Sequence, residues 1–322
     1  MKIPVFYDPR MAAANSSRSP SSAKPSQVIN DWLALSLPFE VAKMQPVGIE
    51  ELAMAHSRKY VEGVLAGRIE NGFRDRCPKI AESLKWTNGS FVSAATHVYR
   101  HGGFACSPTS GFHHAGYAQG GAFCTFNGLM VAAMSLMEAS DSLRIGILDM
   151  DYHYGDGTAE IIDRLQVAER VRQVSGWGDW NRCEPQQLLE EVPAMIDRLE
   201  CDILFYQAGA DMHIDDPLGG LLTTEELRQR DQIVFEHCKK NDLPCVWNFA
   251  GGYRIGRKHS KGIGNSSKYT ACQLRSVQAL RPKLSLKHAT NHHALDRGEF
   301  QSQGGFARLN KIFDAKVQEL LQ

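Results

Sequence analysis

Four short segments of the chain combine residue types that could bind a metal ion and move protons, and the first spans residues 149–157. In this segment Asp149, Asp151 and His153 alternate with apolar or aromatic residues. If the apolar strand before them continues, all three side chains point to one side of it. A carboxylate and an imidazole in this spacing at a strand end can bind one divalent cation. A polar loop that caps the next helix is the alternative.

The second segment, residues 207–219, places Asp211, His213, Asp215 and Asp216 just after another apolar run. One of these carboxylates could complete a metal site with the first segment. Two carboxylates, one imidazole and an open position are typical of a catalytic zinc site and not of a closed structural one. The residues of this segment do not distinguish the three carboxylates, and an exposed acidic turn is the alternative.

The third segment contains the adjacent histidines His113 and His114 in a loop with Gly111. A neutral imidazole can take a proton from a metal-bound water and return it to a departing amine. An imidazole with this role needs a partner on its other ring nitrogen, and Asp149 and Asp156 are the candidates. Two surface histidines without a catalytic role are the alternative.

In the fourth segment Gly251 and Gly252 precede Tyr253. Two glycines let the backbone pass close to a ligand, so Gly252 is expected beside the substrate. The Tyr253 hydroxyl could then donate a hydrogen bond to the oxyanion that develops on an amide carbonyl. An ordinary turn followed by a packed tyrosine is the alternative.

These segments need a scaffold that brings them together. Short apolar runs at residues 144–148, 202–207 and 245–249 each end where a polar segment begins, which is typical of strands buried on both faces of a parallel sheet. We also expect a first strand at residues 3–7 and irregular structure at residues 12–27 and 71–87. Helical spacing of apolar residues predicts helices at residues 28–37, 50–66, 90–100, 127–139, 158–166, 185–199, 224–240, 268–280 and 306–321.

Alternating strands and helices predict an α/β fold with a mostly parallel sheet, and ligands bind at the carboxyl ends of the strands in such sheets. No linker, repeat or shift in composition divides the chain, so residues 1–322 are expected to form a single catalytic domain.

Composition and charge exclude several classes of protein. Of the 322 residues 43% are hydrophobic, and 36 basic residues balance 36 acidic ones, which argues against the binding of phosphate backbones as the main role. The longest apolar-leaning run, residues 128–137, is far shorter than the roughly 20 residues that a membrane-spanning helix needs. The eight cysteines form no C-x-x-C pair. We therefore expect a cytoplasmic protein with no nucleic-acid or membrane partner, and a homo-oligomer is left open.

In this order, the His-His pair, the D-x-D-x-H segment, the Asp-Pro turn and the G-G-Y segment resemble the zinc-dependent histone deacetylase family, which includes the acetylpolyamine amidohydrolases. The resemblance is strongest between His113 and Tyr253. It implies the arginase–deacetylase fold, a three-layer α/β/α sandwich with a central, mostly parallel sheet. It also implies a zinc-dependent amidohydrolase that removes acetyl or other short acyl groups from primary amines such as acyl-lysine or acetylpolyamines.

Carried over to this chain, the resemblance implies that one Zn²⁺ is bound by Asp151, His153 and Asp216. Asp216 is chosen over Asp211 and Asp215 because the family's ligand directly precedes the proline of this turn. The residues that the resemblance implies for catalysis are the tandem histidines, their orienting carboxylates and the oxyanion-stabilising tyrosine: His113, His114, Asp149, Asp156 and Tyr253.

The resemblance also implies a substrate tunnel, with Phe123 on one wall and either Trp177 or Trp180 on the other. A structural K⁺ near Asp149, Asp151 and Ser175 is a further implication. Two other functions are the alternatives. A ureohydrolase-like enzyme with two metal ions would need a carboxylate where Gly155 stands. A catalytically silent acyl-amine-binding protein would lack a metal ligand or a catalytic side chain, and all of them are present.

Overall fold

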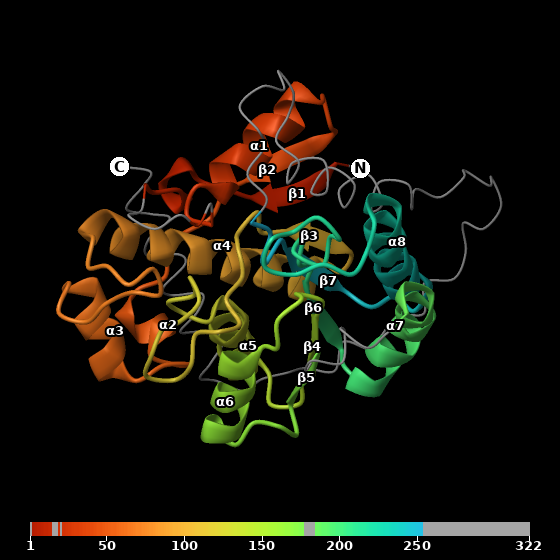
Figure 1. The fold of residues 1–322 in the computed structure, drawn as a ribbon. Coiled ribbons are helices and arrows are strands. Elements are labelled where there is room, and N and C mark those ends of the chain that lie inside the picture. The colour runs from red at the N-terminus through yellow and green to blue at the C-terminus, as the bar shows by residue number, and fades with distance from the viewer. Residues whose placement is uncertain (1, 15–18, 20, 177–183, 254–322) are drawn as a thin grey trace.

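The computed structural model describes residues 2–14, 19, 21–176 and 184–253. They form one seven-stranded sheet in the order β2-β1-β3-β7-β6-β4-β5, and every pair of neighbouring strands is parallel. The strands are β1 (Ile3–Phe6), β2 (Phe39–Ala42), β3 (Phe104–Cys106), β4 (Ile145–Asp149), β5 (Val171–Ser175), β6 (Ile203–Gln207) and β7 (Cys245–Asn248). Figure 1 shows this sheet with helices around it.

The central strands are buried on both faces, and their residues alternate between two hydrophobic cores. Along β6, Ile203 and Phe205 pack into one core, whereas Leu204 and Tyr206 pack into the other. This alternation follows from the two-residue repeat of a strand. It explains why the run is continuously apolar and has no polar face.

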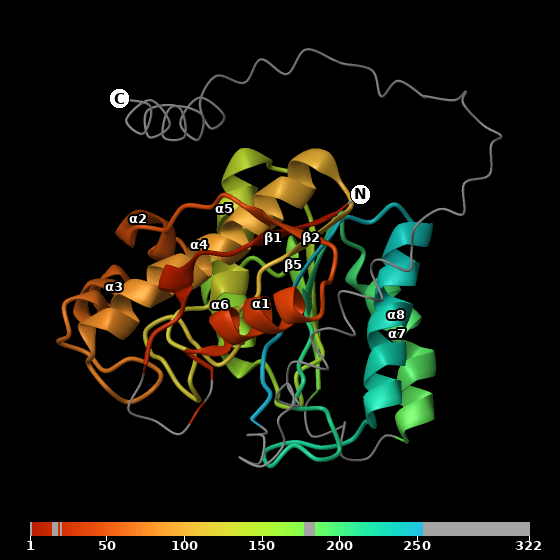
Figure 2. The ribbon, with the colours of Figure 1, turned by 90° about the horizontal axis from the view of Figure 1, so that it is seen from above.

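Helices cover both faces and complete the three layers (Figure 2). The first core receives side chains from α3 (Arg58–Leu65), α4 (Pro78–His101), α5 (Gly128–Ala139) and α6 (Asp156–Leu165). The second core receives them from α1 (Lys24–Ala34), α7 (Pro185–Leu199) and α8 (Thr224–Lys240). The two remaining short elements are η1 (Pro9–Met11) and α2 (Ile49–Leu52).

Local sequence signals set several helix ends. The Thr223 hydroxyl accepts the Glu226 N–H at 3.3 Å, and the Glu226 carboxylate accepts the Thr223 N–H at 2.7 Å, so the two residues form a capping box at the start of α8. Asn127 caps α5 by accepting the Met130 N–H at 3.2 Å. This cap matters for the site because α5 follows the loop that carries the tandem histidines.

The α/β class, the parallel sheet and the strands at β1, β4, β6 and β7 are confirmed, but some predicted elements are wrong. Residues 78–87 belong to α4 and are not irregular, because Pro78 occupies the first helical turn, where its missing N–H costs nothing. Gly89 lies inside the same helix because a Cβ there would stand 2.0 Å from the Gln45 carbonyl oxygen. The helix predicted at residues 50–66 is two helices, α2 and α3, separated by residues 53–57.

Three strands were not predicted: β2, β3 and β5. β2 and β5 are the two edges of the sheet, and their alternating polar residues and short length resemble loop sequence. The helices predicted at residues 268–280 and 306–321 lie outside the described residues. Among the helices that are described, none has the length and apolar character needed to cross a membrane.

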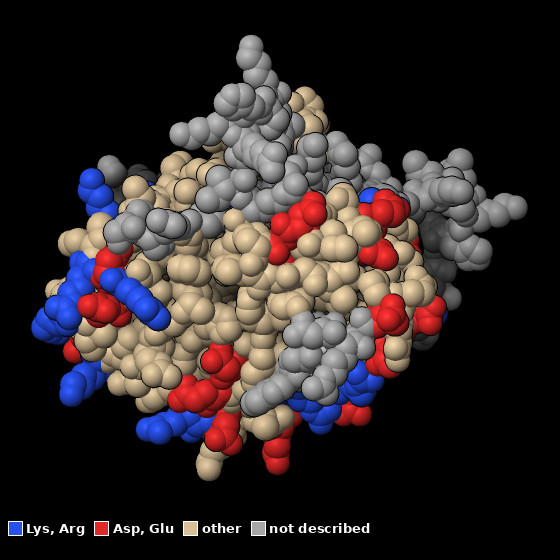
Figure 3. All heavy atoms as spheres, viewed as in Figure 1, with Lys and Arg blue, Asp and Glu red and all other residues tan. Residues whose placement is uncertain are grey.

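On the face of the molecule in Figure 3, groups of Lys and Arg side chains lie beside Asp and Glu side chains, with uncharged surface between them. This distribution agrees with the balance of 36 basic and 36 acidic residues in the chain.

Candidate active site

The polar segments meet where β4, β6 and β7 end. These strands are neighbours in the sheet, and Asp149 pairs with Gln207, which in turn pairs with Asn248. The segments that follow are therefore brought to one edge, as expected for the ligand site of a parallel sheet. The tandem histidines reach this edge from the loop between β3 and α5, because the Thr158 N–H donates to the His113 carbonyl at 3.0 Å.

Asp151, His153 and Asp211 form a cluster that could hold a metal ion, with one ligand atom from each residue within 4.8 Å of the others. The Nδ1 atom of His153 lies 3.1 Å from Asp151 Oδ1 and 3.1 Å from Asp211 Oδ2. Within the described part of the chain, no other set of three His, Cys, Asp or Glu side chains comes this close together.

The electrostatics of this cluster fit a divalent cation. Both aspartates are buried, and burial together with the neighbouring Asp151 charge raises the pKa of the Asp211 carboxyl. Two buried carboxylates side by side are costly without a compensating cation. Two carboxylate oxygens and one imidazole nitrogen, with the half-buried His153 toward solvent, match the ligands of an open catalytic zinc site.

Asp216, the third ligand that the resemblance implies, stays a prediction, and its contacts differ from those of Asp211. Asp216 Oδ2 accepts the Tyr253 N–H at 2.7 Å, and its Oδ1 accepts the Leu218 N–H at 3.0 Å. Asp211, which is fully buried, points at Asp151 and His153 instead.

The glycine two residues before Asp211 lets its segment pack closely against the segment of Asp151. A Cβ at Gly209 would lie 2.5 Å from the Asp151 Cα and 2.6 Å from Asp211 Oδ1, so only glycine lets the two ligand segments approach. A Cβ at Gly251 would likewise lie 2.2 Å from Asp211 Oδ2. Gly209 and Gly251 thus allow the backbone to pack closely against the Asp211 carboxylate.

Each tandem histidine is held by a carboxylate through its Nδ1 atom. His113 Nδ1 lies 2.8 Å from Asp149 Oδ2, and His114 Nδ1 lies 2.6 Å from Asp156 Oδ1. The two imidazole rings are 4.0 Å apart between centroids. With Nδ1 occupied, Nε2 of each ring is available to the site, and His113 Nε2 is 3.6 Å from Asp151 Oδ1.

The two histidines differ in their surroundings. Burial acts to lower the pKa of His113, but the charges of Asp149 and Asp151 outweigh it and raise this pKa to about 9. Burial and the neighbouring His113 lower the pKa of His114. Asp149 is fully buried, whereas the side chain of Asp156 is 66% exposed, so the second dyad is the one open to solvent.

Tyr253 lies on a turn that is fixed at several points. The Gly251 N–H donates to Asp151 Oδ2 at 2.7 Å, and Gly252 has a φ of +129°, a conformation that favours glycine. The buried Lys24 ammonium donates to the carbonyls of Ala250 at 2.6 Å and Gly251 at 3.0 Å. Lys24 was not predicted, because it lies in a segment without motif or periodicity, far away in the sequence.

Phe123 is placed beside the catalytic tyrosine candidate. Its ring is 5.7 Å from the Tyr253 ring and 6.0 Å from the Phe73 ring, between centroids. An aromatic side chain therefore flanks the phenol, and the tunnel itself stays a prediction. Trp177 and Trp180, the candidates for the opposite wall, lie outside the described residues.

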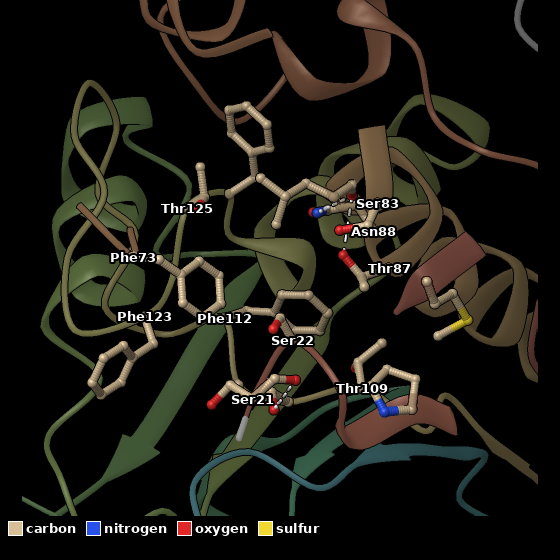
Figure 4. A pocket seen from close by; sticks show the side chains of 16 residues that line it. Ser21, Ser22, Phe73, Ser83, Thr87, Asn88, Thr109, Phe112, Phe123 and Thr125 are labelled. Carbon is tan, nitrogen blue, oxygen red and sulfur yellow. Dashed lines mark hydrogen bonds between the residues drawn. The ribbon is translucent and has the colours of Figure 1, made fainter. Parts of the chain in front are cut away.

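A small cavity of about 40 Å³ adjoins the histidine-bearing loop (Figure 4). Gly111, Phe112 and Phe123 line it on the side of the site, and the Phe112 ring projects into its centre. The remaining lining includes hydroxyl side chains: Ser21, Ser22, Ser83, Thr87, Thr109, Ser110 and Thr125. Rings and hydroxyls thus line this cavity, and neither tandem histidine is among its lining residues.

The potassium site stays a prediction. Ser175 Oγ accepts the Gly155 N–H at 3.0 Å and lies 3.4 Å from Asp149 Oδ2. Gln207, which was not singled out from the sequence, donates to Asp149 Oδ1 at 2.9 Å. The carboxylate that orients His113 is thereby held by side chains from both strands next to its own, β5 and β6.

Comparison with known proteins agrees with this geometry. Residues 20–178 match the family model of the histone deacetylase domain. A probable deacetylase of Methanothermobacter thermautotrophicus is 27% identical over 241 residues, which cover 64% of this chain and 72% of the relative. Acetylpolyamine amidohydrolase 2 of Pseudomonas aeruginosa is 40% identical over 186 residues, 47% of this chain and 50% of the relative.

The fold is shared with a solved structure of an acetylpolyamine aminohydrolase from Burkholderia pseudomallei. The TM-score is 0.66 at 18% identity, and the match covers 87% of this chain and 99% of that one. The seven-stranded parallel sheet with helices on both faces is accordingly the arginase–deacetylase sandwich. The family model, the relatives and the fold agree: the chain is similar to histone deacetylases in sequence over residues 20–178 and in its fold.

Proposed function

We propose that this chain is a zinc-dependent amidohydrolase that removes acetyl or other short acyl groups from primary amines. The observation that carries the proposal is the convergence of a three-ligand cluster, Asp151, His153 and Asp211, with the carboxylate-held histidines His113 and His114. The names of the similar proteins, a deacetylase and an acetylpolyamine amidohydrolase, support the same reaction class.

When bound at this cluster, a zinc ion would polarise the amide carbonyl and lower the pKa of a water molecule toward roughly 7. The protein side chains account for the proton movements. The dyads of His113 with Asp149 and of His114 with Asp156 supply two Nε2 atoms, one to accept a proton from the attacking water and one to donate to the leaving amine.

Tyr253 supplies the remaining polar group. Its ring flanks Phe123, and its backbone is fixed by Asp216 and by the turn that the Lys24 ammonium holds. The phenol keeps its proton at neutral pH, because burial and the neighbouring carboxylates raise its pKa. A protonated hydroxyl in this place is suited to donate to a developing oxyanion.

The substrates we propose are small acylated amines or acyl-lysine side chains, handled by a cytoplasmic enzyme that needs neither nucleic acid nor membrane. The ureohydrolase alternative is disfavoured, since the described residues hold a single three-ligand cluster and Gly155 offers no further carboxylate.

The test is release of acetate by the zinc-loaded protein from a panel of acetyl-lysine peptides, acetylpolyamines and longer acyl amines. We expect turnover of at least one class, which is lost after chelation and restored by Zn²⁺. Tight binding of these amides by the zinc-loaded protein with no release of acid from any of them would contradict the proposal and favour the silent binding protein.

A further inference from the structure

Arg230, in α8, is an arginine with no exposed surface, and it lies behind the candidate metal site. Its Nη1 atom donates to the Gly209 carbonyl at 2.8 Å and to the Met150 carbonyl at 3.2 Å. Met150 directly precedes the ligand Asp151, and Gly209 stands two residues before the ligand Asp211. One nitrogen atom therefore bridges the two segments that carry the carboxylate ligands.

The rest of the guanidinium is held in turn by Asp231. Arg230 Nε and Nη2 donate to Asp231 Oδ1 at 3.0 and 2.8 Å, and the Tyr206 hydroxyl donates to the same oxygen at 2.5 Å. Asp231 is 2% exposed and Tyr206 is fully buried. The planar fork of arginine is thus fixed on one side while its other side bonds the ligand segments.

Burial of this ion pair is not explained by stability, because a well-packed apolar pair of similar volume is often as stable or more so. The hydrogen bonds of Arg230 Nη1 to the two carbonyls offer a reason to retain the buried ion pair. Gly209 allows the two segments to approach, and the shared donor fixes how far apart their carbonyls lie. Groups that orient metal ligands from outside commonly control metal affinity.

We propose that Arg230 is a positioning residue for the metal site, which sets the separation of the Asp151 segment from the segment of Asp211 and Asp216 through the carbonyls of Met150 and Gly209. The inference rests on the proposed function, since it takes carboxylates of these two segments, together with His153, as the metal ligands.

The decisive variant is Arg230→Lys, because the positive charge of Arg230 and its hydrogen bonds to the two carbonyls have opposite effects on metal affinity. Removal of the positive charge would by itself favour a cation at the nearby carboxylates, whereas loss of the bridge would disfavour it. Lysine keeps the charge but has one nitrogen, which cannot replace the bonds of Nη1, Nη2 and Nε from their separate positions.

Arg170→Lys is the matched control. Arg170 also donates to two backbone carbonyls, those of Leu143 and Ser140, and it directly precedes β5, at the amino ends of the strands. The same substitution there removes comparable bonds at the opposite edge of the sheet from the candidate site.

The measurement is titration of the metal-free proteins with Co²⁺, followed by visible absorption, which reports both affinity and ligand geometry. We expect Arg230→Lys to weaken Co²⁺ binding about 10- to 100-fold and to change the absorption bands. In acetate release, kcat should fall with little change in KM. Arg170→Lys should match the wild type in affinity, spectrum and kcat.

A folded Arg230→Lys variant with wild-type affinity and spectrum would overturn the inference. If that variant does not fold, Tyr206→Phe decides, because it removes only the hydroxyl that fixes Asp231. Weakening of Co²⁺ binding by Tyr206→Phe supports the inference, and unchanged binding overturns it. Failure of the wild type to bind Co²⁺ would instead refute the proposed function, so the two failures are distinguishable.

Discussion

The carboxylate of Asp216 accepts the backbone N–H of Tyr253 at 2.7 Å. This bond joins the acidic turn after β6 to the glycine turn after β7, which carries the phenol. Asp216 is therefore placed to orient the tyrosine, whereas Asp211, five residues earlier, faces Asp151 and His153. The two carboxylates of this turn thus have different contacts, and their roles can be tested separately.

Substitution of the two aspartates should separate metal binding from catalysis. We expect Asp211→Asn to weaken Zn²⁺ binding by more than about 100-fold, because it removes a ligand, not merely an orienting group. Asp216→Ala should keep its metal but lose about tenfold in kcat, the cost of a hydrogen bond to a charged group. Metal content after dialysis and acetate release measure the two effects. The assignment is wrong if Asp216→Ala loses the metal and Asp211→Asn keeps it.

Removal of the phenol should slow turnover without affecting the metal. Loss of one oxyanion donor costs roughly 10²- to 10³-fold in kcat, and we expect this for Tyr253→Phe, with wild-type zinc content. Tyr99→Phe, in α4, is the control, and its kcat should match that of the wild type. Unaltered turnover of Tyr253→Phe would exclude the phenol from the mechanism.

Acid should destabilise the protein through His56. Its Nδ1 bonds the Gly116 carbonyl at 2.9 Å and its Nε2 accepts the Asn127 N–H at 2.8 Å, so it braces the loop that follows the tandem histidines. Burial lowers its pKa to about 4. The unfolded chain takes up the proton below about pH 6.5 and the folded one only below about 4, so stability falls as the pH drops through this window.

Because the unfolded chain binds this proton more readily, we expect His56 to lower the free energy of unfolding by about 2 kcal/mol when the pH falls from 7 to 5. Urea denaturation of the wild type and His56→Gln at both pH values measures it, and the variant should lose less stability on acidification. His101→Gln, at an exposed position of α4, is the control and should behave as the wild type does. An identical pH dependence in all three proteins would rule out this role.

The glycine between the ligand segments should tolerate no side chain. In Gly209→Ala the new Cβ would stand 2.5 Å from the Asp151 Cα, so we expect about 1–3 kcal/mol of destabilisation and a Co²⁺ affinity lowered at least about tenfold. Gly103→Ala is the control: its φ of +73° strains an alanine by about 1–2 kcal/mol, but nothing lies within 4 Å of the new Cβ. Equal Co²⁺ affinity in both variants would contradict the argument.

The central strands and the four polar segments could be predicted from the sequence because their signals are local. β6 is a continuous apolar run followed directly by polar residues, and α8 has its capping box in the sequence. The edge strands β2 and β5 lack such a run, and only pairing with a neighbour makes them strands. Length and periodicity within the sequence could not reveal that.

The residues of the candidate site also divide into those with a local sequence signal and those that depend on distant contacts. His113 and His114 stand out because two histidines are adjacent, whereas Lys24 and Arg230 act on backbone carbonyls far away in the sequence. Nothing near them in the sequence marks those contacts. Asp211 and Asp216 have the same chemistry, and the choice between them depends on the direction of each side chain in the folded turn.

The order of the central strands also bears on how the protein matures. Asp151, Asp211 and Gly251 follow β4, β6 and β7, and these strands are neighbours in space although long stretches of chain separate them. Closing such large loops is slow, so parallel pairing of this kind comes late in folding. During synthesis, a nascent chain that has not yet placed β7 would lack the Gly251 amide and Tyr253. The candidate active site is therefore complete only once β7 has joined the sheet.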